Sequence, residues 1–330
     1  MRGSSICFSL TVLTAAVIAV CLTGCATPAA NTAALSNSPF SWSPPAPPFT
    51  VSHKISGIGV GPFVLSGQDP NLGTVVPDNQ LQYLISDAAQ YASLIRTFGT
   101  SNTLQDAGTY IHQAGAKAMI GASLTNENTA ANMQANTAEL NRLIAMANAG
   151  QADIVTVGDE TLYTGTLTPS QLLAYMAYVK ANVPTSVQVS TVDTWSMLVN
   201  NPNVIAACDV VLANIYPFYE NASETGALAQ LQSDYAQILK ASGTKQLMIA
   251  ETGWPSSGSP PTQGSVAIPS QVNQLAYFLG AEQWARQNNI AIVWFEAFSE
   301  PWKANYNDYP SWGIFDSNYI IESQFASAFQ

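Results

Sequence analysis

An alternation of short apolar runs and helical stretches is the feature of this sequence that most constrains its fold. Several of the runs are almost continuously apolar, as parallel strands buried on both faces are. From about residue 55 onward eight such runs recur: Ile55–Phe63, Ser93–Phe98, Lys117–Leu124, Asp153–Gly158, Val187–Val192, Asp209–Tyr216, Gln246–Glu251 and Ala291–Phe298. The alternation predicts an α/β fold.

The stretches between these runs carry helix signals. Asp78 follows Pro77 and is expected to cap a helix over Gln80–Tyr91. Thr168-Pro169 offers an N-cap followed by proline at the first helical position, and predicts a helix through Leu172–Val179. Apolar residues three and four positions apart predict further helices, over Glu139–Asn148, Leu228–Lys240 and Val272–Gln287, with a short one near Trp195–Val199.

Eight β–α units within about 275 residues favour a single closed (β/α)8 TIM barrel over residues 53–330. A doubly wound open sheet shares the same alternation. The glycine cluster Gly57-x-Gly59-x-Gly61 invites comparison with the phosphate loop of such sheets. Its spacing differs from a dinucleotide fingerprint, however, and Pro62 blocks the helix start that would cradle a phosphate. We therefore favour the barrel.

The first residues carry an export signal. Arg2 precedes an apolar run over Ile6–Leu22, and this run ends in Leu22-Thr23-Gly24-Cys25, which resembles the bacterial lipobox. That resemblance implies a signal peptide over residues 1–24 and lipidation of Cys25. A plain signal peptide and a membrane-spanning helix are the alternatives, although the run is short for a span and no charged stop follows it.

Residues 25–52 are rich in Ala, Pro, Ser and Thr after the cysteine, and such a stretch stays extended rather than burying a core. It is expected to tether the folded domain to a membrane through the lipid on Cys25. Ala26 follows that cysteine, where Asp would signal inner-membrane retention in enteric bacteria. The expected location is therefore the outer membrane, on its periplasmic side, or the cell surface.

Composition narrows the class of ligand. The chain has 10 Lys and Arg against 21 Asp and Glu, a net charge of −11. A nucleic-acid surface needs clustered basic residues, so we expect no nucleic-acid partner. Charged residues make up 9% and aromatic residues 10%, which suits an uncharged, hydroxyl-rich ligand. Cys208 is expected to be buried, and with only His53 and His112 the sequence has no usual zinc cluster. We expect no metal or organic cofactor. No protein partner is predicted.

Carboxylates follow three of the predicted strands. Asp159 and Glu160 end the fourth run, Glu251 ends the seventh, and Glu296 and Glu300 lie in and just after the eighth. In a (β/α)8 barrel, catalytic groups gather where strands run into the following loops. Glycoside cleavage needs one protonated carboxyl and one ionised carboxylate. One isolated Glu would be a solvated loop charge, but two at separate strand ends favour a glycosidase.

Longer motifs around these carboxylates resemble glycoside hydrolase family 17, which contains β-1,3-glucanases and β-1,3-glucan transglycosylases. The resemblance covers about residues 55 to 325 and implies a retaining enzyme that hydrolyses β-1,3-glucan or transfers glucosyl units through a covalent glucosyl-enzyme intermediate. The sequence leaves hydrolysis and transfer open. The matching stretches are Ile95-Arg96-Thr97-Phe98, Val157-Gly158-x-Glu160, Asn214-Ile215-Tyr216-Pro217-Phe218, the highly specific Glu251-Thr252-Gly253-Trp254-Pro255-Ser256, and the transferase-like Phe295-Glu296-Ala297-Phe298-x-Glu300-Pro301-Trp302-Lys303.

Position by position, the resemblance implies catalytic roles for two residues. Glu160 would be the general acid and then the general base, and Glu251 would be the nucleophile. Arg96 and Tyr216 would hydrogen-bond the nucleophile and keep it ionised. The plainer interpretations are a barrel-interior ion pair for Arg96 and a core position for Tyr216.

The same resemblance implies a supporting set. Glu300 and Lys303 match a family pair beside the active centre, and Glu296 lies near them in the sequence. Trp254 and Trp302 are expected to stack on sugar faces. Packing of its own loop is the alternative for Trp302.

Two positions depart from the family pattern. The residue before the acid is usually Asn and reaches the sugar 2-hydroxyl, but here it is Asp159, which when ionised only accepts hydrogen bonds. Its charge is expected to raise the pKa of Glu160. Many relatives have Trp after the third strand, where this chain has Gly121-Ala122-Ser123-Leu124. The alternative function, a catalytically weak or inactive glucan-binding lipoprotein, rests mainly on Asp159.

Overall fold

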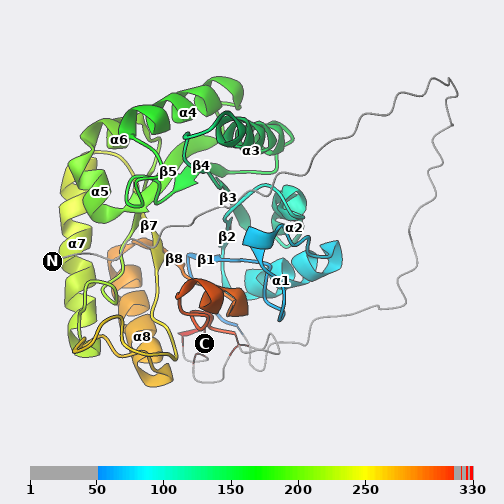
Figure 1. Ribbon diagram of the computed structural model, residues 1–330. Helices are drawn as coiled ribbons and strands as arrows, with labels where there is room; N and C mark the ends of the chain where they lie inside the picture. Colours follow the sequence, from blue (N-terminus) through cyan, green and yellow to red (C-terminus); the bar gives the residue numbers. More distant parts are fainter. Residues whose placement is uncertain (1–50, 316–320, 322–324, 326–327, 330) are drawn as a thin grey trace, which may run out of the picture.

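The structure, a computed structural model, describes residues 51–315, 321, 325 and 328–329. Eight parallel strands close into one barrel in chain order, and Ile58 of the first strand pairs with Trp294 of the last. The predicted (β/α)8 barrel is confirmed (Figure 1), and each predicted run overlaps one strand. The strands are β1 (Gly57–Gly59), β2 (Leu94–Thr97), β3 (Lys117–Ala122), β4 (Ile154–Asp159), β5 (Gln188–Thr194), β6 (Val211–Asn214), β7 (Leu247–Thr252) and β8 (Ala291–Trp294).

Helices surround this barrel. All the predicted helices are present, with bounds longer than the apolar periodicity indicated, and α2 and α6 are additional short helices. The α-helices are α1 (Asp78–Tyr91), α2 (Ala107–Gln113), α3 (Ala130–Asn148), α4 (Pro169–Asn182), α5 (Trp195–Asn200), α6 (Pro202–Ala207), α7 (Glu224–Ser242) and α8 (Gln271–Asn288).

The two predicted helix caps had different outcomes. Thr168 caps α4 as expected, because its side chain accepts the N–H of Gln171 in a capping box. The expected cap at Asp78 is wrong. The helix α1 begins at Asp78 itself, after Pro77, which makes no side-chain cap. Asp78 thus lies in the first turn, where its negative charge favours the helix dipole.

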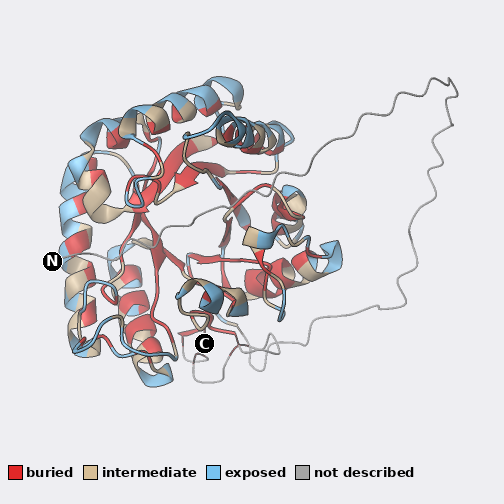
Figure 2. Ribbon diagram, in the orientation of Figure 1, coloured by how far each residue is buried: buried red, intermediate tan, exposed pale blue. Residues whose placement is uncertain are grey.

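The core has two layers, because alternate residues of each strand face opposite sides of the barrel wall. Leu94, Met119, Ile154 and Leu212 belong to the cluster that fills the barrel interior, and their strand neighbours pack outward against the helices. Figure 2 shows the buried strands and the buried inner faces of the helices. Cys208 is buried at 1% exposure, as expected. Polar side chains, among them Arg96, Asp159 and Glu251, lie at the C-terminal ends of the strands.

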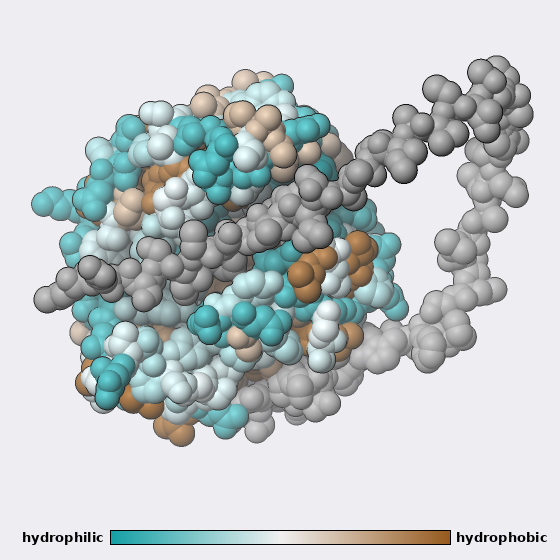
Figure 3. Space-filling model, viewed as in Figure 1, coloured by the Kyte–Doolittle hydropathy of each residue, from teal (hydrophilic) through white to brown (hydrophobic). Residues whose placement is uncertain are grey.

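The expected signal peptide, Cys25 and the tether up to residue 50 lie outside the described residues. At the start of the described part, the Ser52 N–H donates to the Phe329 carbonyl at 2.7 Å. Among described residues, none of the helices combines the length and apolar character that crossing a membrane requires. The coloured surface in Figure 3 is mostly hydrophilic or neutral, with apolar side chains in small separate groups.

Candidate active site

The segment at the end of β6 connects the two candidate carboxyls. Asn214 Nδ2 donates to Glu160 Oε1 at 2.9 Å, and the Tyr216 hydroxyl donates to Glu251 Oε2 at 2.8 Å. Asn214 and Tyr216 are two residues apart, and this spacing places both side chains on the same side of an extended chain. The end of β6 therefore positions Glu160 from β4 and Glu251 from β7 in one site. The sequence motif contained Asn214, but its contact with Glu160 was not anticipated.

The backbone after β4 turns sharply at Glu160. Gly158 has φ 77° and Glu160 has φ 48°, and the pairing of β4 with β5 shifts register between Thr156 and Asp159. The Glu160 N–H donates to the Val192 carbonyl at 2.9 Å. Positive φ is uncommon outside glycine and persists where surrounding contacts impose it, often at functional sites. This local conformation directs the Glu160 side chain to Asn214.

Asp193 in β5 holds the loop that follows Glu160. Its carboxylate accepts the N–H groups of Leu162 at 2.8 Å and Tyr163 at 3.2 Å. Burial raises the pKa of Asp193 to about 7. Sequence reasoning missed this residue, although an Asp directly after the predicted run Val187–Val192 is a signal, since functional groups of a barrel gather at the C-terminal strand ends.

Arg96 lies inside the barrel mouth and is 1% exposed. Its Nη1 contacts Glu251 Oε1 at 2.5 Å and the Ala250 carbonyl at 3.0 Å. Its Nη2 pairs with Asp159 Oδ2 at 2.9 Å, and the Asp159 side chain is 32% exposed. Arg96 was expected either to hydrogen-bond Glu251 or to form an ion pair inside the barrel. It does both in one contact, because its buried ion-pair partner is Glu251. One positive charge is shared between two carboxylates.

The electrostatic surroundings of Glu160 favour its protonated form. Burial raises the pKa of Glu160 well above the ordinary value, and the negative charges of Glu251 and Asp159 add to this rise. The expected effect of Asp159 on this pKa therefore has the right direction. The hydrogen bond from Asn214 lowers the pKa of Glu160, but this donor is neutral.

Glu251 has the stronger set of donors. Burial, and then the charge of Asp159, raise the pKa of Glu251 to about 7, while Arg96 and Tyr216 act to lower it. Glu251 receives two hydrogen bonds, one from a cation, whereas Glu160 receives one from a neutral amide. A proton shared by the pair therefore resides on Glu160. One protonated carboxyl beside one carboxylate is the division that an acid and a nucleophile require.

Lys303 lies buried between Glu296 and Glu300, the two supporting carboxylates predicted after β8. Its Nζ pairs with Glu296 and lies 3.0 Å from Glu300 Oε2, and it is 4.2 Å from the centroid of the Phe295 ring. Burial raises the pKa of Glu296 well above its ordinary value. Glu300 packs against Gly61, where an added Cβ would lie 2.3 Å from Oε1.

Several packed aromatic rings connect the cluster of Lys303, Glu296 and Glu300 to Glu251. Tyr216 packs edge to face against Phe295 and Trp312, with ring centroids 6.2 and 5.5 Å apart. Phe295 and Trp312 also contact each other, at 5.7 Å. Trp312 was not anticipated, because no carboxylate motif surrounds it. These rings fix the Tyr216 hydroxyl that binds Glu251.

Trp254 does not have the expected sugar-facing position. It is 1% exposed, its ring packs against Phe218 and Tyr277 at 5.1 and 5.7 Å, and its Nε1 donates to the Ile268 carbonyl at 3.0 Å. A ring enclosed in this way cannot stack on a sugar, so that expectation is wrong. Trp254 instead packs the loop after β7. Trp302, by contrast, is partly exposed.

Metal-binding side chains are not clustered in the described part of the chain. No group of three or more His, Cys, Asp or Glu side chains there could hold a metal ion.

Comparison with known proteins gives consistent matches. Residues 64–313 match the model of the BtgE/BtgC glycoside hydrolase domain. A glucan 1,3-beta-glucosidase of Candida albicans is 29% identical over 269 residues, which cover 71% of this chain and 83% of that protein. A glucan 1,3-beta-glucosidase of Saccharomyces cerevisiae is 28% identical over 294 residues, covering 82% and 92%. The fold is shared with a glycoside hydrolase family 17 beta-1,3-glucanosyltransferase from Rhizomucor miehei (TM-score 0.69, 24% identity, covering 82% of this chain and 96% of that one).

Proposed function

The chain belongs to the BtgE/BtgC glycoside hydrolase family, and on that basis we propose that it acts on β-1,3-glucan with retention of anomeric configuration. The substrate is supported by the similar glucan 1,3-beta-glucosidases and the glucanosyltransferase of the same fold. The observation that carries the mechanism is the unequal division of donors. Glu251 accepts hydrogen bonds from Arg96 and Tyr216, whereas Glu160 accepts one from the Asn214 amide.

In the first step Glu160 donates its proton to the glycosidic oxygen. Glu251 attacks the anomeric carbon, the carbon–oxygen bond to the leaving chain breaks, and a glucosyl ester forms on Glu251. Arg96 and Tyr216 hold the attacking carboxylate in place. Because they are fixed before the substrate arrives, no rearrangement of these donors is needed during the reaction.

In the second step Glu160, now ionised, removes a proton from the incoming hydroxyl. The hydroxyl oxygen attacks the anomeric carbon and Glu251 leaves as a carboxylate, restored to its contacts with Arg96 and Tyr216. If the hydroxyl belongs to water the product is a shorter glucan. If it belongs to a second glucan chain the product is a transferred, longer one.

Product analysis tests this proposal. The purified full-length chain is incubated with laminarihexaose, and the products are separated over time beside Glu160→Gln, Glu251→Gln and a control, Glu224→Gln, from the first turn of α7. We expect both site variants to lose activity and the control to retain it. Shorter oligosaccharides alone identify a hydrolase, and products longer than six units identify a transferase. Binding without any product would contradict the proposal and favour the glucan-binding lipoprotein.

We also propose that the enzyme is exported and anchored by lipid on Cys25, which is supported by Leu22-Thr23-Gly24-Cys25 at the end of the apolar run. Residues 25–52 then act as the tether between the membrane and the barrel. Metabolic labelling with an alkyne fatty acid tests this. Label on the wild-type chain and none on Cys25→Ser, with the variant leaving the membrane fraction, is the expected result. An unlabelled chain would favour a plain signal peptide or a spanning helix.

A further inference from the structure

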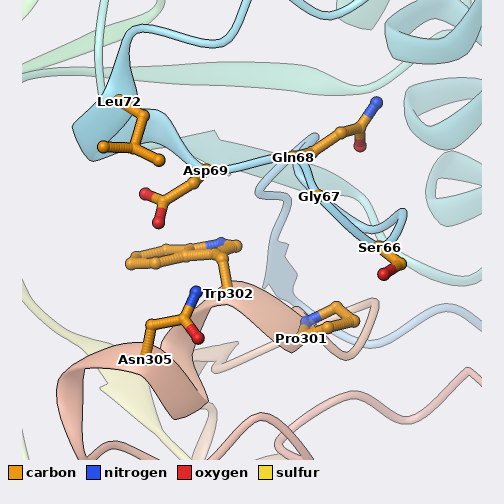
Figure 4. A pocket seen from close by; sticks show the side chains of 8 residues that line it. All are labelled: Ser66, Gly67, Gln68, Asp69, Leu72, Pro301, Trp302 and Asn305. Carbon is orange, nitrogen blue, oxygen red and sulfur yellow. The ribbon is translucent and has the colours of Figure 1, made fainter.

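A cavity of about 290 Å³ lies between the loop after β1 and the 3₁₀ helix η3 (Pro301–Tyr306). Figure 4 shows the Trp302 indole edge-on, with Asp69 and Leu72 on one side of its plane and Asn305 on the other. Ligand sites typically combine an apolar or aromatic wall with a few fixed polar groups. The lining residues are Ser66, Gly67, Gln68, Asp69, Leu72, Pro301, Trp302 and Asn305.

Asp69 is the polar group most firmly fixed in this cavity. The residue is 4% exposed, its Oδ1 accepts the Asn71 N–H at 2.9 Å, and its Oδ2 accepts the Tyr306 hydroxyl at 3.1 Å. Contacts from both walls of the cavity thus hold its carboxylate. Each oxygen keeps a further lone pair that can accept a hydroxyl hydrogen.

The charge of the cavity restricts the class of ligand. Asp69 is acidic and the lining contains no Lys or Arg, so an anionic ligand would meet repulsion without a compensating cation. A neutral, hydroxyl-rich ligand would meet a hydrogen-bond acceptor at Asp69 and an aromatic face at Trp302. These are the contacts that an uncharged saccharide uses, with its ring carbons on the indole and its hydroxyls on the carboxylate.

The cavity adjoins the candidate active site. Both of its walls follow C-terminal strand ends, β1 and β8, so they lie on the same face of the barrel as the candidate carboxyls. Lys303, next to Trp302, places its Nζ 4.2 Å from the Phe295 ring centroid. Phe295 contacts Tyr216, whose hydroxyl binds Glu251. A continuous set of side chains thus leads from the cavity to the proposed nucleophile.

We propose that this cavity is an outlying saccharide subsite. It binds a neutral segment of the same glucan chain that is cleaved at Glu160 and Glu251, and so sets the chain length that the enzyme prefers. This inference rests on the proposed function and adds to it a specificity-determining pair, Trp302 and Asp69.

The test is the dependence of kcat/KM on substrate length. Full-length wild type, Trp302→Ala and Trp302→Tyr are compared on laminari-oligosaccharides from two to seven units. For each protein we compare kcat/KM on the longest substrate with kcat/KM on the shortest substrate that is cleaved. In Trp302→Ala the ratio of the two should fall roughly tenfold, mainly through KM. Trp302→Tyr should recover most of the ratio. Tyr178→Ala, on the exposed side of α4, is the control and should match the wild type.

The outcomes separate this inference from the proposed function. If the wild type cleaves the oligosaccharides and Trp302→Ala keeps the wild-type ratio, the subsite is overturned while the function stands. If the wild type cleaves none, the proposed function fails, and titration calorimetry with laminariheptaose decides about the cavity. Roughly tenfold weaker binding by Trp302→Ala would then support a glycan site there. Equal affinity for both proteins, or binding by neither, would overturn it.

Discussion

Asp159 and Glu251, from the ends of β4 and β7, both pair with the guanidinium of Arg96, at 2.9 and 2.5 Å. The positive charge of Arg96 is therefore shared between the proposed nucleophile, Glu251, and a second carboxylate, Asp159. The more exposed of them, Asp159, occupies the position where the resembled family usually has Asn. The arginine thus faces two negative charges here, whereas with Asn at position 159 it would face one.

Replacing Asp159 by Asn is expected to move the pH profile of kcat/KM toward lower pH on both limbs. The charge of Asp159 raises the pKa of Glu251 and that of Glu160. The acid limb reports ionisation of Glu251 and the basic limb reports loss of the proton from Glu160. Removing the charge lowers both pKa values, so both limbs shift in the same direction.

The control for this variant is Asp209→Asn, which lies before β6 at the opposite end of the barrel and pairs with Lys180. Its profile should match that of the wild type. An Asp159→Asn enzyme with an unchanged profile, or with limbs that move in opposite directions, would show that Asp159 does not act on the pair by charge.

Arg96→Lys is expected to lower kcat/KM about a hundredfold. A lysine presents a single point charge and cannot reproduce the planar fork that contacts Asp159 and Glu251 together. In the double variant Arg96→Lys, Asp159→Asn the lysine pairs with Glu251 alone, so part of the lost kcat/KM should be recovered. Steady-state kinetics on the four proteins of this cycle give the coupling, and strictly additive effects would argue against a shared cation.

Gly61→Ala is expected to destabilise the cluster around Lys303. The new Cβ would lie 2.3 Å from Glu300 Oε1, so the buried Glu300 carboxylate, which pairs with Lys303, must shift. We expect a loss of about 1–3 kcal/mol in the free energy of unfolding, measured by urea denaturation. Gly280→Ala in α8, where the Cβ would meet Leu228 at 3.6 Å, is the matched control and should be no less stable than the wild type. Equal stability of the two variants would contradict the account.

Asp87→Asn is expected to stabilise the protein at pH 8 and to have little effect near pH 4. Burial raises the pKa of Asp87 to about 7 from 3.8, so the folded state loses stability as pH rises between these values. The stabilisation at pH 8 should reach up to about 4 kcal/mol, at about 1.4 kcal/mol per pKa unit. Urea denaturation at both pH values measures it. A variant less stable than the wild type at pH 8 would show that Asp87 is favourably ionised.

The barrel could be predicted from the sequence because strands buried on both faces leave long apolar runs that no surface element reproduces. The ends of those runs also located Glu160 and Glu251, since parallel strands of a barrel bring their C-terminal ends to one face. Arg96 and Tyr216 followed only from the resemblance to glycoside hydrolase family 17. The sequence-based expectations failed where local geometry decides. Pro77 precedes the helix directly, so Asp78 lies inside it rather than before it.

The sequence also did not predict the direction of side chains in the loops that follow the strands. Trp254 and Trp302 both follow carboxylates in aromatic-rich motifs, yet the loop after β7 turns Trp254 into the core while Trp302 lines a cavity. Asp193 was overlooked because it belongs to none of the recognised motifs and its partners, the backbone N–H groups of Leu162, Tyr163 and Thr194, leave no trace in the sequence. Contacts of this kind depend on the path of the loop, which apolar periodicity does not encode.

The roles of the two glutamates are tested most directly by azide rescue on an activated donor, 2,4-dinitrophenyl β-laminaribioside. This donor needs no acid to lose its leaving group. With Glu160→Ala the glucosyl ester on Glu251 should form and be opened by azide, which gives the β-glycosyl azide. With Glu251→Ala azide should replace the missing nucleophile and give the α-glycosyl azide. NMR of the products distinguishes the two anomers. The predicted result is β from Glu160→Ala and α from Glu251→Ala, and the reverse assignment, or the same anomer from both variants, would contradict the account.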